Sequence, residues 1–103
     1  PLFDEEIVQI SLGYDYSAAL TLTGRLFTWG INTYGKLGDE TYQKSNLPKD
    51  ITQFFSLLDG EKISQITLGY NHSAALTTNG RIFTWGYNKY NSGAKTVLVK
   101  GFY

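Results

Sequence analysis

Two tripeptides carry the residues best suited to chemistry or binding, Tyr14-Asp15-Tyr16 and Tyr70-Asn71-His72. Tyrosine rings offer a broad amphipathic contact area at a low cost in side-chain entropy, so they suit the binding of a partner molecule. The alternative is that these rings pack against their own neighbours. The candidate partner-binding residues are therefore Tyr14, Asp15, Tyr16, Tyr70, Asn71 and His72.

His72 followed by Ser73 raises the question of catalysis. A serine nucleophile needs an aligned base, an orienting acid and an oxyanion hole. Adjacent residues of a β-strand point to opposite faces, so this pair is poorly placed for proton transfer. One His and no Cys cannot supply a multi-histidine or thiolate metal site. The sequence predicts no catalytic residue, no metal site and no enzyme activity.

Residues 30–37, GINTYGKL, come close to a phosphate-binding P-loop. Such a loop needs Ser or Thr after the lysine to reach Mg²⁺, and this sequence has Leu37 there. No helical pattern follows the segment either. We therefore expect no nucleotide and no other cofactor.

The composition narrows the classes of partner. The chain has 103 residues, of which 42% are hydrophobic and 17% charged, and its nine basic residues balance its nine acidic ones. This is too apolar for a disordered chain, and a neutral chain lacks the positive field that draws nucleic acid or anionic membranes. No apolar run reaches the roughly 20 residues of a membrane span, and no signal-peptide pattern is visible. We expect a soluble protein with no nucleic-acid or membrane partner, and the sequence does not indicate its compartment.

An internal repeat positions the candidate residues. Residues 7–34 align with residues 63–90 at an offset of 56, and 19 of the 28 aligned positions are identical. Each copy reads as three short antiparallel strands, because an alternating segment is followed by two apolar segments joined at Thr23-Gly24 or Asn79-Gly80. Residues 96–103, TVLVKGFY, predict one more strand with Val97 and Val99 on one face.

The segment between the copies has a different pattern. Asn46-Leu47-Pro48 is expected to be extended or turn-like. Residues 50–60, DITQFFSLLDG, carry apolar side chains at helical spacing, with Asp50 as a candidate N-cap and Gln53 completing a capping box. We expect one or two helical turns that pack Phe54 or Phe55 onto a sheet edge. The predicted organisation is a first repeat over 1–45, a connector over 46–62 and a second repeat over 63–103.

The stretch LGYDYSAALTLTGRLFTWGINTYGKLGD resembles the repeat of the regulator of chromosome condensation family. The first copy carries the family pattern at Gly13, Ser17, Ala19, Leu20, Gly24, Trp29, Gly30, Asn32, Tyr34, Gly35, Leu37 and Gly38. The second copy carries it at Gly69, His72, Ser73, Ala75, Leu76, Gly80, Trp85, Gly86, Asn88 and Tyr90 and then departs from it. The resemblance implies a β-propeller, usually of seven blades with four strands each.

The resemblance also implies how the chain is completed. Blades of a propeller cover one another's apolar faces, and two blades cannot close a ring. We expect this chain to be part of a longer propeller or to self-associate. The expected core and self-association residues are Leu20, Phe27, Trp29, Leu76, Phe83 and Trp85. The predicted function is a non-enzymatic protein-interaction scaffold; the alternative is a propeller ring that binds a ligand or glycan with its loop tyrosines.

Overall fold

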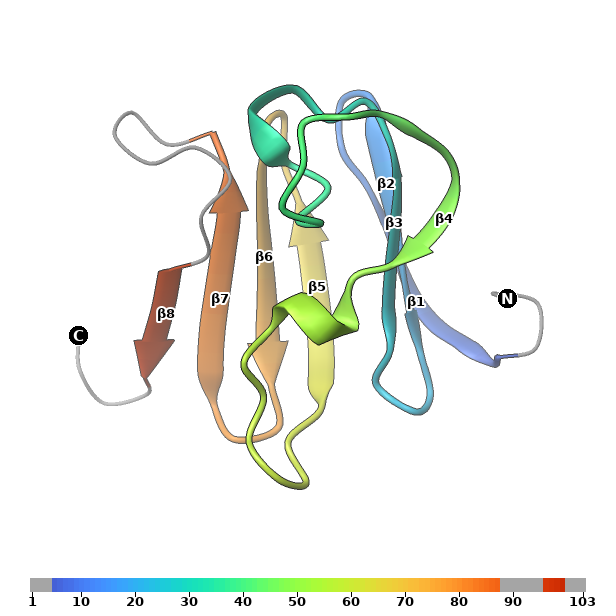
Figure 1. Cartoon of the computed structure of the whole chain (residues 1–103). Coiled ribbons are helices and arrows are strands. Elements are labelled where there is room, and N and C mark those ends of the chain that lie inside the picture. The colour runs from blue at the N-terminus through green and yellow to red at the C-terminus, as the bar shows by residue number, and fades with distance from the viewer. Residues whose placement is uncertain (1–4, 88–95, 100–103) are drawn as a thin grey trace.

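The computed structural model describes residues 5–87 and 96–99, which form two antiparallel sheets of four strands each (Figure 1). The strands of the first sheet, called blade one, are β1 (Ile7–Leu12), β2 (Tyr16–Thr21), β3 (Leu26–Gly30) and β4 (Ser45–Asp50). The strands of the second sheet, called blade two, are β5 (Ile63–Leu68), β6 (His72–Thr77), β7 (Arg81–Gly86) and β8 (Thr96–Val99). Each sheet is a meander in chain order, so the all-β, two-blade prediction is confirmed.

The two copies fold alike because they share their turn and strand signals. The predicted hairpins form at Gly24 and Gly80, both with positive φ, and β2 pairs with β3 as β6 pairs with β7. The last predicted strand is present as β8 and pairs with β7; residues 100–103 of that prediction lie outside the described residues.

The fourth strand of blade one lies where the sequence predicts a connector. β4 pairs with the edge of β3, placing Asp50 opposite Phe27, so the first sheet continues beyond residue 45. Pro48 is tolerated because β4 is an edge strand, where a missing N–H costs no sheet hydrogen bond. Its side chains are mostly exposed, and the apolar alternation that reveals a strand is therefore absent.

The expected helix after β4 is a single 3-10 turn, η3 (Thr52–Phe54). The N-cap residue of this turn is Ile51 and not the predicted Asp50, although the Asp50 carboxylate accepts the backbone N–H of Thr52 at 2.9 Å. The chain then becomes extended at Phe55, whose buried ring contacts Phe83 and Trp85 edge-on at centroid distances of 5.1 and 5.2 Å. Within the described ranges, no helix has the length and apolar character to cross a membrane.

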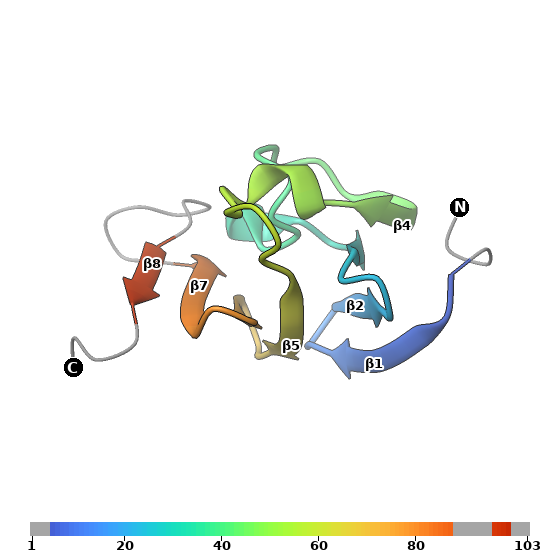
Figure 2. The same ribbon diagram turned by 90° about the horizontal axis from the view of Figure 1, so that it is seen from below.

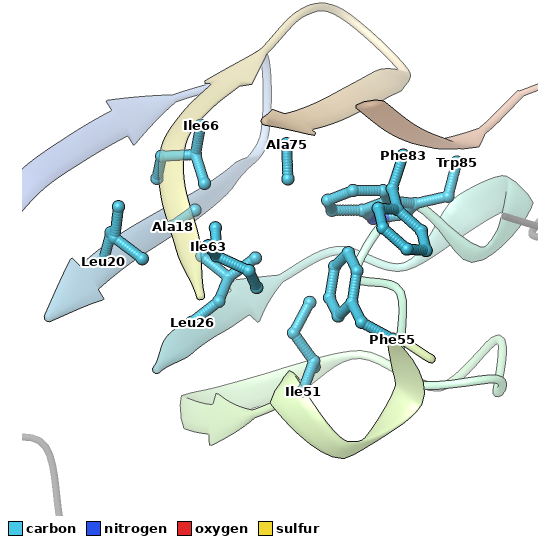
Figure 3. Packing of buried hydrophobic residues seen from close by; sticks show 10 residues of the cluster. All are labelled: Ala18, Leu20, Leu26, Ile51, Phe55, Ile63, Ile66, Ala75, Phe83 and Trp85. Atoms are coloured by element: carbon cyan, nitrogen blue, oxygen red, sulfur yellow. The ribbon is translucent and has the colours of Figure 1, made fainter. Parts of the chain in front are cut away.

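The two sheets meet along an interface that we call the seam. They approach each other at β1, β2 and β5 and diverge toward β4 and β8, with the connector in the angle between them (Figure 2). Its apolar core comprises Ala18, Leu20 and Leu26 from blade one, Ile51 and Phe55 from the connector, and Ile63, Ile66, Ala75, Phe83 and Trp85 from blade two (Figure 3). Each blade thus turns one face into the seam and the opposite face away from it.

Equivalent positions of the repeat therefore have different surroundings. Ala18 and Leu20 of β2 enter the seam, whereas Ala75 enters it from β6 and is the counterpart of Ala19. Among the residues expected to form the core, Leu20, Phe27, Phe83 and Trp85 are buried, and Trp29 and Leu76 are only half-buried.

An ion pair closes the connector onto blade two. The Glu61 carboxylate, fully buried, accepts two hydrogen bonds from Arg81, at 2.6 and 2.9 Å, and others from Thr77 and the Leu58 N–H. These contacts, the Arg81 hydrogen bond above all, lower the pKa of Glu61 to about 2. In blade one, Arg25 pairs with two carboxylates, Glu5 and Asp50.

The ion pair between Glu61 and Arg81 makes the stability of the fold depend on pH in a predictable direction. A carboxyl whose pKa is lower in the folded chain stabilises the fold above its unfolded pKa, and the contribution disappears as pH falls from about 4.5 toward 2. Glu61→Gln should lower the free energy of unfolding at pH 7 by about 2 kcal/mol and flatten its decline below pH 4.5. Chemical denaturation at several pH values measures both effects.

Glu5→Gln is the matched control, because Arg25 keeps Asp50 as a second partner. It should cost less at pH 7 than Glu61→Gln. Equal losses, or an unchanged pH profile in the Glu61 variant, would contradict this account.

Candidate functional site

The loops that follow β1 and β5 lie at the same end of the two blades and bring two tyrosines together. The rings of Tyr14 and Tyr70 stack with their centroids 4.2 Å apart and an angle of 30° between their planes. Both side chains stay in solvent, with exposed fractions of 67% and 63%. The repeat places this pair, because the two residues are equivalent positions of neighbouring blades.

A second aromatic pair lies at this end of the blades. Tyr87, which follows β7, meets Tyr34 of the short 3-10 turn η2 (Thr33–Gly35) edge-on at a centroid distance of 4.6 Å. Both rings are partly exposed. We call the four residues Tyr14, Tyr34, Tyr70 and Tyr87 the tyrosine rim. Tyr34 and Tyr87 were not among the predicted binding residues. The repeat gives no signal for Tyr87, because its counterpart in the first copy is Ile31.

A buried lysine ties the two loops beneath the stacked rings. The Lys36 ammonium pairs with the Asp15 carboxylate and donates to Asn71 Oδ1 at 2.9 Å. It also lies 5.0 Å from the centre of the Tyr16 ring, and the side chain is only 1% exposed. The ammonium group thus faces a carboxylate, an amide oxygen and an aromatic ring. These three contacts hold the loops of both blades together.

The loop from Asn32 to Asp39 brings Lys36 to that position. The Asn32 side chain accepts the Leu37 N–H at 2.9 Å and donates to Asp39 Oδ1 at 3.1 Å, which folds the loop back on itself. The Lys36 carbonyl then accepts the indole N–H of Trp85 at 3.0 Å. In the sequence, this lysine is notable only as part of a segment that comes close to a P-loop. The signal for its structural role is the Tyr-Gly-x-Leu-Gly tail of the repeat.

Tyr16 crosses the seam instead of facing a partner. It is buried, and its hydroxyl donates to the His72 carbonyl at 2.8 Å and lies 2.8 Å from Ser73 Oγ. Burial raises the pKa of the Tyr16 phenol. Tyr16 thus links the two blades and is not available to a partner.

The six candidate binding residues therefore fall into separate groups. Tyr14 and Tyr70 are exposed and in contact, Asp15 and Asn71 share Lys36, and Tyr16 is buried. His72 is exposed at the start of β6, whereas Ser73 is buried on the other face and donates to the Lys36 carbonyl. Over residues 5–87 and 96–99, no three acidic or histidine side chains are grouped to hold a metal ion.

The chain folds into two four-stranded meanders that diverge from a shared inner seam. This is the arrangement of neighbouring blades in a β-propeller, so this chain forms two blades of such a protein. The regulator of chromosome condensation (RCC1) repeat matches it over residues 23–76, and a second form of that repeat matches residues 7–36 and 63–92. The chain belongs to the family of RCC1-repeat proteins.

Its relatives are much longer than this chain. The human "Probable E3 ubiquitin-protein ligase HERC4" is 42% identical over 89 residues, which are 86% of this chain and 8% of that protein. Human WBSCR16 superposes with a TM-score of 0.80 at 24% identity, covering 97% of this chain and 27% of its own. Yeast RCC1 (Prp20), solved bound to Kap60, superposes with a TM-score of 0.76 at 23% identity over 95% of this chain and 26% of its own.

Proposed function

We propose that this chain is a non-enzymatic protein-interaction scaffold that packs against further propeller blades through its two outward faces. The observation that carries the proposal is the row of exposed apolar side chains on β1. Val8, Ile10 and Leu12 have exposed fractions of 48%, 64% and 71% on this strand, whose register shifts between Ile7 and Gln9. Such a surface is typical of an interaction face, and neighbouring blades are what cover it in a propeller.

The cost of leaving these faces open supports the same conclusion. Burying one such aliphatic side chain contributes about 1.5–3 kcal/mol, and the seam shows that the repeat has residues able to do so. Ile66, the counterpart of Ile10, is 5% exposed because blade one covers it. The partner is another copy of this chain or neighbouring repeats of the same kind.

The proposal predicts a mass larger than one chain in solution. We expect the wild-type chain to associate at micromolar concentration and Ile10→Glu to shift it toward the monomer at least about tenfold, because a charge on that face cannot be buried unpaired. Sedimentation equilibrium measures the mass. Leu22→Glu is the matched control: Leu22 is 62% exposed but lies beyond the end of β2, and its substitution should leave the mass unchanged. A wild-type chain that stays monomeric would contradict the proposal that another copy of this chain is the partner.

A partner of another kind is proposed for the tyrosine rim. Lys36 and Tyr16 join the two loops on which Tyr14 and Tyr70 stack, which should reduce the entropy lost when a partner contacts the pair. That yeast RCC1 was solved bound to Kap60 supports a protein partner in general. Exposed stacked rings also suit the apolar faces of sugars, which keeps a glycan as the second candidate.

Single substitutions test the rim. Tyr14→Ala or Tyr70→Ala should weaken binding of a captured protein or an arrayed glycan about tenfold or more, because aromatic anchors dominate such surfaces. Tyr42→Ala is the control, since Tyr42 is equally exposed, at 67%, and is not one of the rim residues. The rim would be removed from the proposed function if binding were unchanged in all three variants. The same would follow if the chain bound neither a captured protein nor an arrayed glycan.

A further inference from the structure

The outward face of blade two repeats the face with which blade one enters the seam. In blade one, Ala18, Leu20 and Leu26 make that contact. Their counterparts in blade two are Ala74, Leu76 and Ile82, which are only half-buried. These residues line a shallow open hollow together with Gln65 and Thr67.

A polar clamp of the seam is repeated on this open face. The Gln9 carboxamide donates to the Ile66 carbonyl at 2.7 Å and accepts the Ile66 N–H at 3.0 Å, so one side chain satisfies both backbone groups of one residue. Ser11 Oγ accepts the next such N–H, from Leu68, at 3.0 Å. Gln65 and Thr67 occupy the corresponding positions on the open face and carry the same donor and acceptor groups.

The outward face of blade one repeats, in turn, the face that blade two turns into the seam. At each of these positions the two copies carry the same residue: Ile7 and Ile63, Ile10 and Ile66, Leu12 and Leu68, Ser17 and Ser73, Ala19 and Ala75, Phe27 and Phe83, and Trp29 and Trp85. Ala19 and Phe27 are already buried, whereas Ile10, Leu12 and Trp29 keep exposed surface. The backbone of Ile10 is thus presented as that of Ile66 is to Gln9.

The open face of blade two matches the seam face of blade one, and the open face of blade one matches the seam face of blade two. The two open faces are therefore complementary to each other. Resting on the proposed function, we propose that the occupant of the open face of blade two is the open face of blade one from a second copy. Gln65 clamps the Ile10 backbone of that copy, and Leu76 packs beside Ile10. The zero net charge of the chain leaves no overall repulsion between copies.

This contact is directional. Each chain offers one face of each kind, so every contact joins blade two of one copy to blade one of the next. Copies then close into a ring or continue as a chain, and no two-fold symmetric dimer arises. The contact is weaker than the seam for two reasons: His72 replaces Tyr16, whose hydroxyl crosses the seam, and residues 91–95 read NSGAK where the first copy reads GKLGD.

Two face-specific variants test the direction of the contact. Leu76→Glu blocks the open face of blade two, and Ile10→Glu blocks that of blade one; neither residue belongs to the seam core. Each variant alone is expected to be monomeric. An equimolar mixture is expected to form a complex of two chains that grows no further, because that complex holds one intact pair of faces. Sedimentation equilibrium reads all three samples.

Each outcome decides the inference. A variant that remains dimeric alone, or a mixture that stays monomeric while the wild type associates, overturns the directional contact and leaves the proposed scaffold standing. A monomeric wild type overturns the directional contact and also the proposal that copies of this chain cover each other's open faces. Gln65→Ala supplies a test without a new charge: its dissociation constant should rise about tenfold with unchanged stability, because Gln65 is exposed in the single chain. An unchanged dissociation constant overturns the clamp.

Discussion

Replacing Trp85 with alanine should lower the free energy of unfolding by about 3–5 kcal/mol. The indole is 2% exposed, meets the Phe55 ring edge-on at 5.2 Å and donates its N–H to the Lys36 carbonyl at 3.0 Å. Its removal leaves a cavity in the seam and takes away one of the two hydrogen bonds to the Lys36 carbonyl, which keeps that from the Ser73 hydroxyl. The loop that carries Lys36 would lose one of its attachments to blade two and keep those to Asn71 and Ser73.

Trp29 is the matched control for this prediction. It occupies the same position of the repeat, on the outward face of blade one, and is only half-buried. Below the concentration at which copies associate, Trp29→Ala should cost less than half as much as Trp85→Ala. Urea denaturation monitored by circular dichroism measures both variants. Equal costs in the monomer would show that the seam is not where the chain is stabilised.

Gly38→Ala should lower the free energy of unfolding by about 3 kcal/mol. Gly38 has a φ of +79°, and a Cβ there would lie 2.7 Å from the indole nitrogen of Trp85. The side chain therefore adds backbone strain to a steric clash with a rigid, buried ring. The ring has no room to move, so the loop must shift away from the seam.

Gly60→Ala separates strain from the clash. Gly60 has nearly the same φ, +77°, and a Cβ there meets nothing within 4 Å. Its substitution should cost only about 1–2 kcal/mol, the strain alone. Thermal or chemical unfolding of the two variants gives the difference, about 1–2 kcal/mol, assigned to the contact with Trp85. A Gly38 variant no less stable than the Gly60 variant would refute the assignment.

Much of the fold follows from local pattern. The 56-residue offset, the alternation over 7–12 and the hairpin signals at Thr23-Gly24 and Asn79-Gly80 are properties of short segments, and they predicted two meanders correctly. The family resemblance correctly predicted four strands in each. The predicted connector helix became one 3-10 turn, because Phe55 turns into the seam and its backbone must become extended there.

Some features had no local signal. β4 carries Pro48 and exposed side chains, so its pairing with β3 is a matter of which sheet edge lies nearby. In the sequence, Lys36 stands out only within a segment that comes close to a P-loop, a function that Leu37 argues against. It is buried because Asp15 and Asn71, from the loops of two different blades, converge on its ammonium. Contacts of this kind join residues far apart in the sequence, so they cannot be predicted from any single segment.

The sequence alone determined that the chain has two copies of one blade, with the same residues at the same positions. Which of two identical residues is buried depends on how the two blades pack together. Trp85 is covered and Trp29 is half-open, and Ile66 is covered while its counterpart Ile10 lies in solvent. The physical reason is that a blade has two apolar faces, and burial of each depends on the neighbour packed against it. The repeat specifies a surface that fits its own next copy, and position in the assembly determines whether that surface is core or binding site.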